Sequence, residues 1–507
     1  MTEASAGNGS GSSPEMFCTD GATTRHTLEL KSGELSYRAI AEWTTLRKIH
    51  KPVAHVFHTA YLADSDGDRP LTFVFNGGPG AASAYLHMGA LGPRRVAFGD
   101  DGALPAPPVT VVDNLESWLA FTDLVFIDPV GTGFSRAIRD SWDEGKTKDG
   151  GDAQPAEPAE NADYWEINTD LDALGEFIRR FLSQHHRWTS PLFIAGESYG
   201  GFRVAKMARS LQETHGIGLC GALLISPAIE FEGLFGSDYN LTYWTEVFPS
   251  LVASAFQHGL CRNLPDGTDV DRVLQLGESF ATGELTQWLA RGDALTADER
   301  AALVTRFADL TGLPESVVER AGGRVNARKF CRELLREQRR VSGMYDASLS
   351  TVDPFPDRDS FEGPDPSLAG LDRIFTGAIN HQLRNTLQVD SELDYRLLSM
   401  DVFLKWKDKT GEHVFRQLAG AMDDLRYGMS LNPHMRVMIA HGWFDLVTPY
   451  FASGRQIGLM KLTDEQAEML ETRNYNGGHM FYSWNESRRQ FCADAEDFYE
   501  RSVPGGA

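Results

Sequence analysis

Three residues whose side chains could act together in nucleophilic catalysis each follow a stretch predicted to be a buried strand. Ser198 lies in a Gly-Glu-Ser-Tyr-Gly-Gly run at residues 196–201, Asp445 follows the apolar stretch 435–440, and His479 follows two glycines late in the chain. Attack by a serine on an acyl group needs a base, a carboxylate that orients the base, and donors for the oxyanion. Because the carboxyl ends of parallel strands share one edge of a sheet, we expect the three side chains to meet there.

The run around Ser198 has the form of a sharp turn between a strand and a helix. Residues 192–195 form a short apolar strand, and apolar residues recur at helical spacing over residues 204–211. Gly196 and Gly200 allow the backbone strain and the close packing that such a turn requires. A Gly-x-Ser-x-Gly match also occurs by chance, but the flanking strand and helix favour a nucleophilic serine at the bend.

Asp445 and His479 have simpler alternatives. Asp445 could cap the helix that follows it, and a lone histidine among the 14 in the chain is more often a surface or core residue. His479 stands out because it lies on a glycine-containing loop after a strand and a helix. The chain order Ser, Asp, His is typical of α/β-hydrolases and favours a triad of Ser198, Asp445 and His479.

The alternation of strand-like and helix-like segments predicts an α/β fold with a mostly parallel sheet flanked by helices. Antiparallel edge strands are predicted within residues 26–63, and buried parallel strands at residues 71–75, 123–128, 192–195, 219–225 and 435–440. We predict four parts: a disordered tail (1–25), the first part of an α/β-hydrolase core (26–231), an inserted helical cap (232–416) and the second part of the core (417–507).

The composition limits the classes of partner. The 507 residues include 48 Lys+Arg and 71 Asp+Glu, a formal net charge of −23, which argues against nucleic acid or an anionic membrane surface as the main partner. No stretch approaches the roughly 20 apolar residues that span a bilayer, and the start of the chain lacks the features of a signal peptide. We expect a cytoplasmic protein, unless a leader has been removed.

Nothing in the sequence indicates a metal or cofactor. The five cysteines are scattered and odd in number, without the close spacing of a zinc or redox site. We therefore expect no disulfide framework, no metal site and no cofactor. The sequence carries no signal for an oligomeric state.

Four motifs, in order along the chain, resemble those of the serine carboxypeptidase family, and the chain looks like a bacterial-type member. They are Asn-Gly-Gly-Pro-Gly at residues 76–80, Asp-Pro-Val-Gly-Thr-Gly-Phe-Ser at 128–135, Gly-Glu-Ser-Tyr-Gly-Gly at 196–201 and Asn-Gly-Gly-His-Met at 476–480. The resemblance implies an α/β-hydrolase fold with an inserted cap. It also implies hydrolysis of the C-terminal peptide bond of a peptide substrate through an acyl-enzyme intermediate.

The resemblance also implies roles for particular residues in catalysis. Ser198 would be the nucleophile, His479 the base and Asp445 the residue that orients the base. The backbone N–H groups of Gly78 and Tyr199 would form the oxyanion hole.

The substrate's terminal carboxylate would be held by Asn76, the N–H of Gly77 and the carboxyl of Glu197. Two carboxyl groups can bind side by side only if they share a proton, so the pKa of Glu197 should be raised when substrate is bound, and acid pH should be favoured.

The sequence departs from the family pattern at the position of a second glutamate. That glutamate usually lies two residues before a Gly-Pro pair, and the matching residue is Ala90. The proton-sharing network around the substrate carboxylate should therefore be thinner, with His87 or Arg94 as residues that could compensate. The cysteine that often follows the glycine loop is Ala81, which agrees with the absence of a disulfide framework.

Two other functions remain open at this stage. The same catalytic groups serve a serine esterase or acyltransferase, and the altered carboxylate site keeps that alternative open. A third hypothesis is a non-catalytic binding protein that uses the cap as a recognition surface, although such proteins normally lose a triad residue.

Overall fold

A central sheet organises the protein. The computed structural model describes residues 20–31, 33–65, 69–138, 164–358, 361–408 and 419–503, and within them ten strands form one sheet. The order is β1-β2-β3-β7-β4-β9-β10-β13-β14, with β8 paired to β3. The strands from β1 to β3 and the β3–β7 pair are antiparallel, and those from β7 to β14 are parallel. The strands are β1 (Ala22–Leu30), β2 (Gly33–Lys48), β3 (Lys51–Ala63), β4 (Leu71–Phe75), β7 (Asp123–Ile127), β8 (Arg136–Ala137), β9 (Leu192–Glu197), β10 (Gly221–Ile225), β13 (Arg436–Gly442) and β14 (Leu470–Tyr475).

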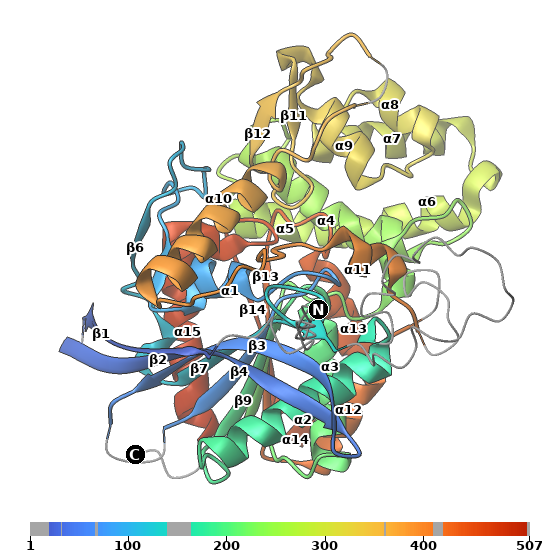
Figure 1. The fold of residues 1–507 in the computed structure, drawn as a ribbon. Coiled ribbons are helices and arrows are strands. Elements are labelled where there is room, and N and C mark those ends of the chain that lie inside the picture. The colour runs from blue at the N-terminus through green and yellow to red at the C-terminus, as the bar shows by residue number, and fades with distance from the viewer. Residues whose placement is uncertain are drawn as a thin grey trace, which may run out of the picture.

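Helices cover both faces of this sheet, which is why its central strands are continuous apolar runs. Phe73 and Phe75 of β4 belong to one hydrophobic cluster, and Val74 between them belongs to another. Helices α2, α3 and α12 pack in the first cluster, and α1, α10 and α15 pack in the second (Figure 1). Their bounds are α1 (Ala84–Leu86), α2 (Ile167–Gln184), α3 (Tyr199–Glu213), α10 (Ala369–Asn380), α12 (Met422–Leu431) and α15 (Asn485–Ser502). The predicted α/β-hydrolase fold is confirmed.

The long segment between β10 and β13 has a hydrophobic cluster of its own, to which Leu446 contributes from outside the segment. In Figure 1 helices α4 to α9 lie together above the sheet. The helices in this segment, besides α10, are α4 (Thr242–Gln257), α5 (Val270–Phe280), α6 (Thr286–Arg291), α7 (Ala297–Thr311), α8 (Glu315–Ala321), α9 (Ala327–Leu334) and α11 (Met400–Lys405). The segment also contains the hairpin of β11 (Arg340–Ser342) and β12 (Ser350–Val352), and α10 packs on the sheet. A separate cap over residues 232–416 stays a prediction.

Other segments complete the fold. The hairpin of β5 (Arg94–Val96) and β6 (Val111–Asp113) follows α1, while α13 (Tyr450–Leu459) and α14 (Asp464–Glu468) lie between β13 and β14. β1 begins at Ala22, inside the range predicted as a tail, because Ala22 pairs with Ala41 of β2. Residues 1–19 and the predicted loop 142–161 lie outside the described residues.

The described cysteines carry free thiols. They are Cys220, Cys261, Cys331 and Cys492, and Cys18 lies outside the described residues. A search of the described residues finds no helix with the length and apolar character needed to cross a bilayer.

A buried ion pair joins α2 and α3, which pack on the same face of the sheet. Arg203 of α3 donates to Asp170 of α2 at 2.6 Å, and both side chains are almost fully buried. A second guanidinium nitrogen of Arg203 donates to the backbone carbonyl of Asn76 at 2.8 Å. The pair therefore fixes α2 and α3 against the loop that follows β4.

We predict that Arg203→Met lowers the free energy of unfolding by about 3–5 kcal/mol, because it leaves Asp170 buried without its counter-charge. Urea unfolding followed by circular dichroism measures the change. Arg489→Met, which removes an exposed ion pair with Glu486, is the control and should unfold like the wild type. Equal midpoints for the two variants would contradict the role given to Arg203.

Candidate active site

Ser198 lies at a strained turn between β9 and α3. Its backbone has φ +60° and ψ −123°, a conformation that side-chain-bearing residues rarely adopt. The Ser198 N–H donates to the carbonyl of Ile225 at the end of β10, at 2.9 Å. A Cβ added at Gly196 would lie 2.2 Å from the carbonyl oxygen of Gly200, so the turn requires glycine there. The turn places the half-buried Ser198 at the carboxyl edge of the sheet.

His479 and Asp445 form a buried hydrogen-bonded pair at the same edge. His479 Nδ1 lies 2.7 Å from Asp445 Oδ2. The other carboxylate oxygen of Asp445 accepts the backbone N–H groups of Val447 at 2.8 Å and Thr448 at 3.0 Å. The carboxylate is therefore fixed on both oxygens, and the imidazole is held through Nδ1 so that Nε2 is left for chemistry.

The charges of the pair stabilise each other. Burial alone would raise the pKa of Asp445, but the neighbouring His479 and the hydrogen bonds hold it below its usual value. Burial alone would lower the pKa of His479, but the Asp445 carboxylate raises it above its usual value. An imidazolium formed when this histidine takes a proton would be stabilised where it forms.

Two side chains that the sequence analysis missed connect these segments. The Ser226 hydroxyl donates to the His479 carbonyl at 2.8 Å. The Thr448 hydroxyl lies 2.7 Å from Asp445 Oδ2, 3.0 Å from the Ser226 carbonyl and 3.0 Å from His479 Nδ1. Ser226 directly follows β10 and Thr448 lies three residues after Asp445, but no spacing rule in the sequence predicts these contacts.

Ser198 and the backbone of His479 thus contact consecutive residues at the end of β10. Ser198 is hydrogen-bonded to the carbonyl of Ile225, and His479 to the side chain of the next residue, Ser226. Among the described residues no hydrogen bond joins the Ser198 hydroxyl to the His479 ring. Such bonds are often long before a substrate binds and tighten in the complex.

The glycine loop after β4 packs directly against the turn at Ser198. A Cβ added at Gly77 would lie 2.5 Å from the backbone nitrogen of Tyr199. Gly78 has φ +100°, which only glycine adopts without strain. Tyr199 is the first residue of α3, where a backbone N–H has no acceptor within the helix. The loop therefore lies against the backbone at the start of α3.

Glu197, directly before the serine, is buried and hydrogen-bonded through both carboxyl oxygens. The Asn76 amide donates to Oε2, and the Tyr482 hydroxyl donates to Oε1 at 2.8 Å. Burial raises the pKa of Glu197 to about 7, although the nearby His479 and the two hydrogen bonds oppose the shift. The carboxyl is therefore poised to hold a proton near neutral pH even without substrate.

Tyr482 is the second hydrogen-bond partner of Glu197. His87 and Arg94, which we expected could take this place, are bonded to other residues. His87 is bonded to Tyr61 at 2.7 Å, and Arg94 lies 3.4 Å from Asp113. Ala90 is buried in the turn after α1. A Cβ at its neighbour Gly89 would lie 2.7 Å from the Tyr482 ring, so Tyr482 packs closely beside the position of the missing glutamate.

The motif at residues 128–135 supports the glycine loop and does not reach the triad. Asp128 Oδ1 accepts the backbone N–H of Ser83 at 2.9 Å, and Ser135 donates to the Asp128 carbonyl at 2.6 Å. A Cβ at Gly133 would collide with the Asp128 carboxyl. The motif therefore anchors the start of α1, which follows the glycine loop.

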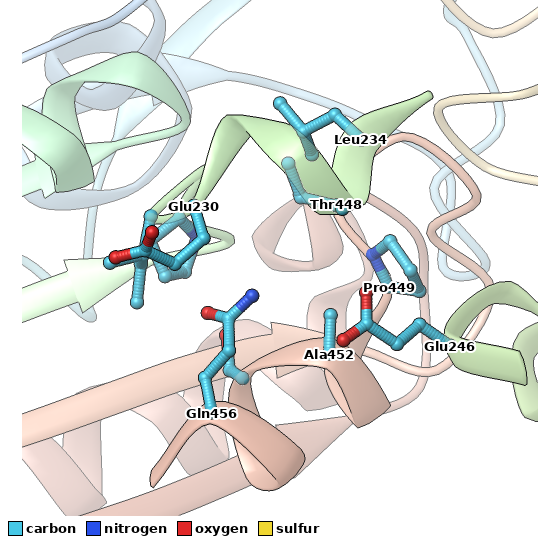
Figure 2. Close-up of a pocket in the computed structure, with 11 residues that line it drawn as sticks. Glu230, Leu234, Glu246, Thr448, Pro449, Ala452 and Gln456 are labelled. Carbon is cyan, nitrogen blue, oxygen red and sulfur yellow. The ribbon is translucent and has the colours of Figure 1, made fainter. Parts of the chain in front are cut away.

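Two small pockets adjoin the triad segments. The first is lined by Thr448 and by polar side chains that include Glu230, Glu246 and Gln456 (Figure 2). The second is lined by Tyr345 and Met480 together with neighbouring residues. The Tyr345 ring packs edge-on against the His479 ring at 5.3 Å between centroids, so the second pocket lies directly beside the histidine.

Comparison with solved structures finds low sequence identity over most of the chain. VinJ is 12% identical, with a TM-score of 0.36, and the alignment covers 91% of this chain and 99% of VinJ. A proline iminopeptidase from Mycobacterium smegmatis is 14% identical, with a TM-score of 0.35, over 91% of this chain and 98% of that one.

Comparison by sequence finds serine carboxypeptidases. A family model described as serine carboxypeptidase matches residues 46–258. The pheromone-processing carboxypeptidase KEX1 of Yarrowia lipolytica is 29% identical over 35% of this chain and 26% of its own length. Serine carboxypeptidase-like 45 of Arabidopsis thaliana is 27% identical over 37% of this chain and 36% of its own length. The chain thus matches only about a quarter to a third of the length of these relatives. The family match includes Asn76, Glu197 and Ser198 but ends before Asp445 and His479.

We predict that Thr448→Val slows labelling of Ser198 by a fluorophosphonate about tenfold. The substitution keeps the shape of the side chain but removes a hydroxyl bonded to the buried Asp445 carboxylate, a loss on the order of 1.5 kcal/mol. Thr245→Val, which removes a hydroxyl bonded only to helix carbonyls, should label at the wild-type rate. Unchanged labelling of Thr448→Val would show that this hydroxyl does not position the pair.

Proposed function

We propose that the protein is a serine carboxypeptidase that hydrolyses the C-terminal peptide bond of peptides through an acyl-enzyme intermediate. The observation that carries the proposal is the position of the Glu197 carboxyl, held by Asn76 and Tyr482 directly before the candidate nucleophile. Hydrolysis of an ester does not by itself require a group that recognises a free carboxylate. A carboxypeptidase needs a group there that recognises the free end of the chain.

In the proposed reaction Ser198 attacks the carbonyl carbon of the last peptide bond. Its proton passes to His479 Nε2, and the negative charge that develops on the carbonyl oxygen is accepted by the N–H groups of Gly78 and Tyr199. The C–N bond then breaks as His479 gives the proton to the departing amino group. Asp445 stabilises the imidazolium while it exists. Water, activated by His479, then releases the acyl group from Ser198.

Recognition of the terminal carboxylate is assigned to Asn76, the N–H of Gly77 and Glu197. The neutral form of Glu197 can donate a hydrogen bond to a carboxylate, whereas the ionised form would repel it. Support comes from the pKa of Glu197, which burial raises to about 7. The free-acid end of a peptide would therefore bind below that pH, and binding would weaken above it.

Three further features of the protein stay predictions: its division into core and cap, its bacterial type and its cytoplasmic location. The named relatives are from a yeast and a plant. A peptide is the expected partner. The aromatic ring of Tyr345 beside His479 supports the second pocket as the place for a substrate side chain.

We predict that kcat/KM for an N-blocked dipeptide with a free C-terminus falls about tenfold per pH unit above about 7, because Glu197 ionises and repels the substrate. The amide of the same dipeptide should lack this alkaline decline. Glu197→Gln, which stays neutral, should remove the decline. Tyr482→Phe should move it to higher pH, because the Tyr482 hydrogen bond stabilises the ionised form and lowers the pKa.

Release of the C-terminal amino acid, or of the amino-acid amide from the amide substrate, followed across the pH range, measures all four profiles. Ser198→Ala is the control for contaminating peptidases and should show no release. An alkaline decline that persists in Glu197→Gln would contradict the role of Glu197. Comparable rates on the free acid, on the amide and on a simple aryl ester would instead support the esterase alternative.

A further inference from the structure

Three metal-ligating side chains converge on the sheet face covered by α2, apart from the strand ends that carry the triad segments. Glu42 of β2 and His58 of β3 are direct cross-strand partners in the antiparallel pair. His185 follows the last residue of α2. One donor atom from each of the three lies within 4.8 Å of the other two. β3 is separated from β9, the strand before Ser198, by β7 and β4.

The histidine nitrogens of this cluster are buried and make few hydrogen bonds. His58 is 0% exposed, and neither of its ring nitrogens makes a hydrogen bond of good geometry among the described residues, although the backbone of Val56 lies near enough to interact with the ring. His185 Nε2 is also buried without a partner. Burial of an unpaired polar group costs on the order of 1–3 kcal/mol. The two imidazoles lie 3.8 and 3.9 Å from the same Glu42 oxygen. A group that bound both nitrogens and this oxygen at once would remove the cost.

The rings are held in place by packing from α2. Phe177 and Phe181 contact the His58 ring edge-on, at 5.0 and 5.6 Å between centroids, and Phe181 also packs on His185 at 4.2 Å. A neutral imidazole carries a lone pair on one ring nitrogen, and this is the atom that binds a metal ion.

The distances fit a small ion after a modest adjustment. Glu42 Oε1 lies 3.8 Å from His58 Nε2 and 3.9 Å from His185 Nε2. Tetrahedral coordination at about 2.0–2.1 Å holds donor atoms roughly 3.3–3.5 Å apart. The Glu42 oxygen would therefore approach each imidazole by a few tenths of an ångström, and the two imidazole nitrogens, which lie within 4.8 Å of each other, would approach each other by more where they are at that limit. Glu42 is 27% and His185 15% exposed on their side chains, which gives an ion a route from solvent and leaves a fourth position for water.

From this arrangement we propose that Glu42, His58 and His185 form a binding site for one Zn²⁺ ion or a divalent transition metal of similar preference. Two imidazole nitrogens and one carboxylate oxygen are ligands typical of zinc, whereas Ca²⁺ and Mg²⁺ prefer oxygen alone. Gln184 donates to Glu42 Oε1 at 3.0 Å and orients the carboxylate from outside. The bound ion would join β2 and β3 to the end of α2.

Nearby cations set a limit on the affinity but do not block the site. Arg38 and Arg187 act on His185 electrostatically. Arg187 is paired with Asp123 at 2.6 Å, and Arg38 lies 4.0 Å from Asp64. Their charges are therefore partly neutralised by carboxylates outside the cluster.

The test uses the full chain after removal of metals with a chelator. Calorimetric titration with Zn²⁺ should show one equivalent bound per chain, and the thermal midpoint should rise with free zinc by mass action. Co²⁺ in place of Zn²⁺ should give the intense visible absorption of a four-coordinate site. His185→Phe, which keeps the ring packing on Phe181, and Glu42→Gln should both lose the binding and the absorption.

His186→Asn is the matched control, because His186 is the exposed neighbour of His185 and has a positive φ that asparagine tolerates. It should bind one zinc ion like the wild type. The proposal is overturned if the wild type binds no zinc, or if His185→Phe and Glu42→Gln both bind as the wild type does, which would indicate an adventitious ion only. Circular dichroism confirms that each variant is folded.

Discussion

The burial of the Glu197 carboxyl at the end of β9 is the interaction on which the arrangement of the site depends. A buried carboxyl is costly unless its oxygens are hydrogen-bonded, and here Asn76 and Tyr482 bond one oxygen each. Asn76 follows β4 and is itself held by Arg203 through its backbone carbonyl. Since Ser198 is the next residue after Glu197, the contacts that satisfy the carboxyl also fix the glycine loop and the turn that carries the serine.

The histidine loop is fixed by a second group of contacts that belongs to no recognised motif. Ser226 holds the backbone of His479, while Thr448 touches both Asp445 and His479. The close approach of Gly77 to Tyr199 completes the edge, because no larger residue fits at that point. The site is thus assembled from the ends of five neighbouring parallel strands, β4, β9, β10, β13 and β14, and each end is linked to its neighbour by at least one hydrogen bond or close backbone contact.

The features that could be predicted from the sequence are those set by local pattern. The parallel strands are buried on both faces, so their apolar runs are continuous, and β4 lies at the predicted residues 71–75. The glycines around Ser198 likewise reflect a local backbone requirement. Tyr482, Ser226 and Thr448 were missed because their contacts join segments far apart in the chain. Glu42, His58 and His185 were missed for the same reason, since a strand pair and a helix end bring them together without any metal-binding spacing.

The central claim is that Ser198 carries the acyl group during hydrolysis of a peptide with a free C-terminus. The most direct measurement is mass spectrometry of the protein after acid quenching during turnover of an N-blocked dipeptide, with the modified residue located by peptide fragmentation. We expect the blocked acyl group as an ester on Ser198, at a level that rises when hydrolysis of the intermediate is slow. Turnover without an adduct on Ser198, or with the acyl group on another residue, would contradict the account.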